Sequence, residues 1–81
     1  MYYVYVLNCA DKTLYVGYTK NLQARYKQHN SNKVISTQRR LPAKLVYYEC
    51  FISKKDAKAR EIYLKSGSGR DQLRNILKYT I

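Results

Sequence analysis

The segment Tyr2–Tyr18 decides the fold, and its sequence is YYVYVLNCADKTLYVGY. Two runs of β-branched and aromatic residues, Tyr2–Leu7 and Leu14–Tyr18, lie on either side of a polar stretch and predict a β-hairpin. Gly17 within the second run indicates a bulge or the close approach of another group to the backbone. The fold should therefore be built on two tyrosine-rich strands that lie side by side.

The remainder of the chain predicts a helix, a strand and two further helices. Thr19–Asn21 supplies candidate caps for the first helix, and the stretches Ser53–Asp56 and Ser68–Asp71 have the form of capping boxes that open the other two. The expected elements are a helix from Leu22 to about Asn30, a polar and basic connection from Ser31 to Ala43, a strand from Leu45 to Phe51, a helix from Ser53 to about Ser66, and a last helix with Leu73, Ile76 and Leu77 on one face. The order ββαβαα describes a single α+β domain over residues 1–81, a three-stranded antiparallel sheet flanked by helices.

The charge of the chain is unusual for its size. Its 81 residues contain 16 Lys and Arg against 5 Asp and Glu, a net charge of +11, while the apolar fraction of 46% suits a folded domain. Each Lys or Arg that reaches a phosphate releases condensed counterions, which favours nucleic acid as the partner. An anionic membrane surface is the competing partner, but the basic residues are scattered along the chain, so we expect no membrane binding. The expected nucleic-acid contacts are Lys20, Lys33, Arg39, Arg40, Lys44 and Arg70.

The first residues, Met1–Val4, show neither a basic region nor a cleavage site of the kind found in secretory signals, so we expect a cytoplasmic protein. In that compartment Cys9 and Cys50 are expected to be reduced, with a disulfide between them as the alternative. Together with His29 they lack the closely spaced pairs of a structural zinc site. We expect a monomer or a weak homodimer.

The sequence contains no glycine-rich phosphate loop, no nucleophile elbow and no closely spaced cysteine pair. Any chemistry must therefore come from Tyr, Arg, His and Glu side chains. Four of the five acids already have a position in the hairpin turn, in a capping box or in a strand. These four are Asp11, Asp56, Asp71 and Glu49, which leaves Glu61.

Glu61 lies on the apolar side of its predicted helix. At about 100° per residue it falls about 40° from Ala57 and about 60° from Leu64. One explanation is an ion pair with Lys65, four residues later, or an internal hydrogen bond. The other is a metal ligand, because a single hydrated Mg²⁺ takes one or two carboxylates plus water and phosphate oxygens. Both explanations stay open at this point.

Two further pairs of side chains are candidates for a site. Arg25 and His29 stand four apart on the first helix and share a face, either as solvated surface groups or as two groups that seek phosphate. Tyr5 and Tyr15 lie on the two strands of the hairpin and could meet across it. Most of the ten tyrosines are expected to cover the sheet, and stacking on bases is the functional alternative.

The order and spacing of these residues resemble the GIY-YIG nuclease family, in particular small members similar to the amino-terminal nuclease domain of the bacterial excision-repair incision subunit. The resemblance covers essentially the whole chain. The first motif corresponds to Tyr3-Val4-Tyr5, the second to Tyr15-Val16-Gly17, the helix arginine to Arg25, the helix glutamate to Glu61 within Ala59–Lys65, and a histidine common in small members to His29.

This resemblance implies an endonuclease that hydrolyses phosphodiester bonds, in DNA ahead of RNA, with a place in DNA repair. Tyr5 or Tyr15 would position or deprotonate the attacking water, and Arg25 would stabilise charge on the phosphate. Glu61 would hold one divalent ion, Mg²⁺ or Mn²⁺, and His29 would share the proton transfer.

The chain also departs from the family pattern. Tyr3 replaces the glycine of the first motif, Tyr18 stands where some members carry a lysine, and Asn75 is the one match to a late asparagine. The same fold, basic loop and tyrosines would equally serve a DNA- or RNA-binding module that does not cleave, or a general polyanion binder. Glu61 favours a nuclease, because a carboxylate repels a phosphate backbone unless a metal ion lies between them.

Overall fold

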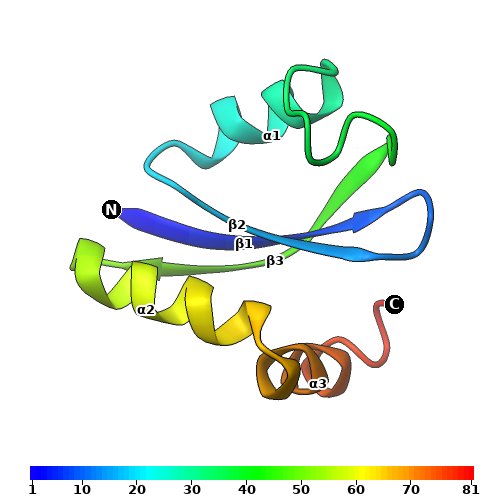
Figure 1. Ribbon diagram of the computed structural model, residues 1–81. Helices are drawn as coiled ribbons and strands as arrows, with labels where there is room; N and C mark the ends of the chain where they lie inside the picture. The colour runs from blue at the N-terminus through cyan, green and yellow to red at the C-terminus, as the bar shows by residue number, and fades with distance from the viewer.

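The computed structural model describes residues 1–81 and shows a three-stranded sheet with helices on both faces (Figure 1). The elements are β1 (Tyr2–Cys9), β2 (Leu14–Thr19), α1 (Leu22–Asn30), β3 (Ala43–Phe51), α2 (Lys54–Lys65) and α3 (Gly67–Ile76). The predicted order ββαβαα and the α+β class are confirmed. None of the three helices combines the length and apolar character needed to cross a lipid bilayer.

The sheet has the strand order β2-β1-β3, and both pairings are antiparallel. β1 is therefore the central strand, and its side chains alternate between the two faces. Val4 and Val6 face α2 and α3, whereas Tyr5 and Leu7 face α1. Because the register pairs Tyr5 with Gly17, the tyrosine of the first strand lies opposite the one glycine of the second.

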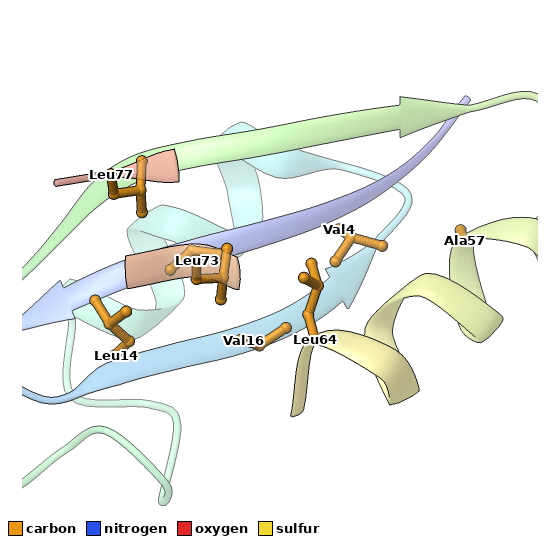
Figure 2. Packing of buried hydrophobic residues seen from close by; sticks show 8 residues of the cluster. Val4, Leu14, Val16, Ala57, Leu64, Leu73 and Leu77 are labelled. Carbon is orange, nitrogen blue, oxygen red and sulfur yellow. The ribbon is translucent and has the colours of Figure 1, made fainter. Parts of the chain in front are cut away.

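The larger core lies between the sheet and the pair α2–α3. Figure 2 shows Leu64 of α2 and Leu73 of α3 against valines of β1 and β2. The cluster consists of Val4, Val6, Leu14, Val16, Ala57, Leu64, Leu73 and Leu77. The opposite face carries a smaller buried cluster of Tyr5, Leu7, Cys9 and Ala43, covered by α1 and its neighbours. The fold thus places its main apolar core on one face and leaves tyrosine side chains on the other.

The second helix begins as predicted, and the third does not. The Ser53 hydroxyl accepts a hydrogen bond from the Asp56 amide, as expected for the first capping box. The cap of α3 is Ser66 and not Ser68, because the Ser66 hydroxyl accepts from the Gly69 amide at 3.2 Å. Asp71 therefore has no capping role. The reason for this early start is spatial, since the backbone of α3 lies directly on the end of α2.

The connection from α1 to β3 is anchored by short-range and long-range contacts. Val34 and Thr37 are buried within it. The Asn30 carboxamide accepts from the Ala43 amide at 3.0 Å and donates to the Ala43 carbonyl at 2.9 Å. These two bonds satisfy the backbone groups of Ala43 in the way that a neighbouring strand would. The strand β3 starts at Ala43, two residues earlier than predicted.

The contact between α2 and α3 predicts a contrast between two glycines. A Cβ at Gly69 would lie 2.0 Å from the Tyr63 carbonyl oxygen and 2.5 Å from the Leu64 Cα, whereas a Cβ at Gly67 would meet nothing within 4 Å. We expect Gly69→Ala to lower the free energy of unfolding by about 1–3 kcal/mol, the usual range for overpacking. Gly67→Ala should leave it unchanged or slightly higher. Urea denaturation of the two variants measures the difference, and equal effects would contradict this account of the helix corner.

Candidate active site

The site begins with the side chain of Tyr5, which leans from β1 across β2. A Cβ at Gly17 would lie 2.3 Å from both Cζ and the hydroxyl oxygen of Tyr5, so only glycine leaves room for the ring. This is the close approach that a glycine in the second strand predicted. The ring is 1% exposed and carries its hydroxyl toward the outer edge of the sheet, where β2 ends the strand order.

A chain of buried hydrogen bonds follows from this hydroxyl. The Tyr5 Oη lies 2.7 Å from His29 Nε2, and His29 Nδ1 lies 2.8 Å from Thr37 Oγ1. The Thr37 hydroxyl in turn donates to the Val34 carbonyl at 3.5 Å. One assignment satisfies every group: Tyr5 donates to Nε2, Nδ1–H donates to Thr37, and Thr37 donates to the carbonyl.

Burial sets the protonation of this pair. It raises the pKa of Tyr5 to about 12; the Arg25 guanidinium opposes the rise, and Tyr15 and Glu61 add to it. Burial also lowers the pKa of His29 to about 4, and the Arg25 charge adds to that shift. At neutral pH the phenol is therefore protonated and the imidazole is neutral, so the bond between them joins two uncharged groups.

Tyr15 and Arg25 are the accessible members of the cluster, because both are only half-buried. The Tyr15 ring centroid lies 5.1 Å from that of His29 and 6.3 Å from that of Tyr5. The Arg25 Nη1 donates to Gln28 Oε1 at 3.0 Å, which orients the guanidinium along α1. His29 is 0% exposed and Tyr5 is 1% exposed, so both lie deeper in the protein than Tyr15 and Arg25.

Glu61 approaches from α2, on the other side of the sheet. Its side chain is 13% exposed, and its carboxylate accepts from Lys65 Nζ at 2.9 Å and from Lys58 Nζ at 3.4 Å. The predicted ion pair with Lys65 is confirmed. The Glu61 charge also raises the pKa of Tyr5, although burial of the phenol is the larger cause.

Glu49, the acid on β3, forms a separate set of contacts with α2. Arg60 binds it through two bonds, Nε to Oε1 at 2.8 Å and Nη2 to Oε2 at 3.0 Å, and the Tyr47 hydroxyl donates to Oε2 at 2.6 Å. This arrangement ties α2 to β3 and holds the pKa of Glu49 below its usual value against the effect of burial. Glu61 is therefore the acid left near the Tyr5 cluster.

A divalent ion would find one protein carboxylate here. No three His, Cys, Asp or Glu side chains come together as a metal cluster. One carboxylate fits a hydrated Mg²⁺ or Mn²⁺ that completes its coordination with water and phosphate oxygens. Lys58 also lies 4.5 Å from the ring centroid of Tyr18, whose buried hydroxyl has no hydrogen-bond partner. The end of β2 thus adds an unpaired polar oxygen close to the lysine that binds Glu61.

The six predicted nucleic-acid contacts are spread over the molecule. Lys20, Lys33, Arg39 and Lys44 are exposed. Arg40 is held inside the connection, where it donates to the Ser36 carbonyl at 2.7 Å and to the Thr13 hydroxyl at 2.8 Å, and its guanidinium carbon lies 6.0 Å from the Tyr15 centroid. Arg70 lies on α3, across the sheet from α1, and donates to the Leu14 carbonyl at 3.2 Å.

Two residues that contact the site were not predicted from the sequence. Thr37 supplies the second partner of His29, and Gln28 orients Arg25. No local pattern marks Thr37, because its role depends on how the connection folds back onto α1. Asn75, the match to the late asparagine of the family, is exposed on α3.

A basic α+β domain that carries a phenol–imidazole pair and an arginine on one face of its sheet, and a carboxylate on a helix of the other face, has the composition of a phosphodiester-cleaving domain. A family model described as the GIY-YIG catalytic domain matches residues 1–75. The chain belongs to the GIY-YIG family, and this family implies nuclease-type activity on nucleic acid.

Relatives with the name UPF0213 resemble the chain over most of its length. A UPF0213 protein of Bacillus licheniformis is 46% identical over 93% of this chain and 78% of its own. One of Clostridium perfringens is 43% identical over 100% of this chain and 88% of its own. The solution NMR structure of a UPF0213 protein from Bacillus halodurans superposes with a TM-score of 0.60 at 38% identity, covering 94% of this chain and 85% of that one.

The contact between Tyr5 and Gly17 predicts a specific coupling between these two positions. Gly17→Ala should displace the phenol ring and lower the free energy of unfolding by about 1–3 kcal/mol. In a Tyr5→Leu background the far end of the ring is gone, so the same alanine should cost much less. Urea denaturation of the four proteins gives the coupling energy. An alanine cost that is equal in both backgrounds would show that the ring does not lie across the glycine.

Proposed function

We propose that this protein is a metal-dependent endonuclease that hydrolyses phosphodiester bonds in DNA. The observation that carries the proposal is the grouping of Tyr15 and Arg25 beside the buried Tyr5–His29 pair at the edge of β2, with Glu61 as the acid that α2 supplies. Membership of the GIY-YIG family supports it. We also propose that the protein acts in the cytoplasm, in DNA repair, as a monomer or a weak homodimer.

The accessible groups take the roles that touch substrate. The Tyr15 hydroxyl orients the attacking water, and the Arg25 guanidinium binds the phosphate and stabilises the charge that develops on it. A phenol with an ordinary pKa near 10 is a weak base at neutral pH. A Mg²⁺ or Mn²⁺ ion held by Glu61 would supply the Lewis acidity that lowers the pKa of water and neutralises phosphate charge.

The buried groups act as positioning residues. The His29 ring meets the Tyr15 ring at an angle of 62°, and Tyr5 fixes the His29 ring by its hydrogen bond. Because His29 stays neutral, it adds no positive charge that would compete with Arg25 for the phosphate. The buried Tyr5–His29 pair therefore holds Tyr15 in place and carries no charge itself.

Charge supports a metal at Glu61. A carboxylate among phosphates is unfavourable unless a cation lies between them, so a metal ion at Glu61 would allow a phosphate to approach it. The exposed cations Lys20, Lys33, Arg39 and Lys44 supply the attraction to the DNA backbone, with Arg40 and Arg70 held close to the protein surface.

One observation favours a second candidate function, a DNA- or RNA-binding module without cleavage. Both oxygens of Glu61 already have a lysine partner, so the protein itself neutralises the carboxylate. In that case Glu61 stabilises α2 and contributes nothing to chemistry.

Cleavage of labelled single-stranded, duplex and branched DNA, and of RNA, separates the two functions. With Mg²⁺ or Mn²⁺ the wild type should cut DNA, and EDTA should abolish cutting. We expect Glu61→Gln to slow cleavage by about 100-fold or more while DNA affinity is retained. Arg25→Ala should slow cleavage more than it weakens binding.

Asp71→Asn is the matched control, because it removes an exposed acid on α3 and should cleave like the wild type. Full cleavage by Glu61→Gln would remove the proposed metal ligand. Salt-sensitive binding without cleavage under every metal condition would favour the binding module.

A further inference from the structure

A hollow of about 420 Å³ lies beside the candidate active site, within the range of roughly 300–1,000 Å³ that small-molecule sites occupy. It is formed by the start of β1, the middle of β3 and the turn that leads into α1. Its lining residues are Tyr3, Lys20, Asn21, Leu22, Gln23 and Tyr48. Leu22 also packs against the buried cluster that contains Tyr5, but none of the six belongs to the Tyr5–His29–Thr37 hydrogen-bond chain or has a role in the cleavage step.

Two aromatic rings form part of its wall. The ring centroids of Tyr3 and Tyr48 lie 6.1 Å apart with an interplanar angle of 59°. Tyr48 is 53% exposed, although it stands in the middle of a strand. Because its ring is not covered by the protein, Tyr48 offers an open face to a planar ligand.

The polar groups of the hollow favour an anionic ligand. Lys20 is exposed and forms no ion pair, and no acidic residue lines the hollow. Its Nζ lies 5.7 Å from the ring centroid of Tyr2, so the exposed Lys20 side chain would turn from Tyr2 to bind a phosphate beside the hollow. The Gln23 side chain is exposed and free to hydrogen-bond. A planar, aromatic and anionic ligand has the chemistry of a nucleotide.

The position of the hollow relates it to the candidate active site. Tyr48 of β3 lies directly beside Tyr5 of β1 in the strand register. Tyr3 lies two residues before Tyr5 on the same face of β1, about 7 Å along the strand. A ligand in the hollow is therefore a near neighbour of a phosphate bound by Arg25.

We infer that this hollow is a nucleobase subsite, in which an unpaired base of the bound strand stacks on Tyr48 and Lys20 binds the adjoining phosphate. The identity of the ligand rests on the proposed function, because a nuclease must hold the strand on both sides of the bond it cuts. Aromatic stacking accepts every base, so this subsite contributes affinity and position without reading sequence.

The test measures binding in EDTA, where no metal-dependent cleavage occurs. The probes are a short single-stranded oligodeoxynucleotide and a set of the same strand, each with one nucleotide made abasic. The wild type should bind one abasic probe roughly 5- to 100-fold more weakly than the intact strand, the loss of one stacked base. Tyr48→Ala should bind the intact strand more weakly by a similar factor and should no longer distinguish that probe.

Three variants serve as controls. Tyr48→Phe keeps the aromatic face and should behave like the wild type. Tyr79→Ala removes a tyrosine that is 93% exposed elsewhere on the surface and should also behave like the wild type. Lys20→Ala should weaken binding to all probes and reduce the salt dependence by about one phosphate contact.

Two results would overturn the subsite: a wild type that binds every abasic probe like the intact strand, or a Tyr48→Ala variant that still discriminates the same probe. Absence of cleavage with metal would overturn the proposed nuclease instead and would leave a positive stacking result standing.

Discussion

The position of the Tyr5 ring is the constraint on which the rest of the site depends. The ring crosses Gly17, and its hydroxyl bonds to His29 at 2.7 Å. This single side chain therefore links β1, β2 and α1, and through His29 it reaches Thr37 in the connection to β3. The strand register, the angle of α1 and the path of that connection must all agree for the bond to form. A site built in this way is rigid because the groups beneath it, Tyr5, His29 and Thr37, are buried and fully hydrogen-bonded.

The two faces of the sheet divide stability and function between them. The larger cluster of eight buried apolar residues lies against α2 and α3, whereas the α1 face carries tyrosines, an imidazole and an arginine. Glu61 lies on α2, where Lys58 and Lys65 bind its carboxylate. The half-buried Tyr15 and Arg25 lie above the buried groups of the α1 face and are not part of either buried cluster. This separation allows an 81-residue chain to hold polar groups at a site and still fold.

Much of the fold could be predicted because its signals are local. The two β-branched and aromatic runs in Tyr2–Tyr18 predicted the hairpin, Gly17 indicated a close approach, and elimination among five acids left Glu61. The features that could not be predicted depend on contacts between distant segments. The α3 cap moved to Ser66 because Gly69 lies against α2, and His29 is buried because Thr37 and Tyr5 close around it. A surface position and a buried one look alike on a short polar helix, so the pattern of α1 alone left the burial of His29 undecided.

The most direct test of the central claim is the protonation state of His29 by NMR, since it is the one histidine of the chain and its ring signals need no assignment. The account predicts a neutral ring with the proton on Nδ1 at pH 7, an unprotonated Nε2 that accepts from Tyr5, and a titration midpoint near 4. A midpoint near 6.5, or a proton on Nε2 at neutral pH, would contradict it. The buried Tyr5–His29 pair would then not be the neutral, hydrogen-bonded support that holds Tyr15 in place.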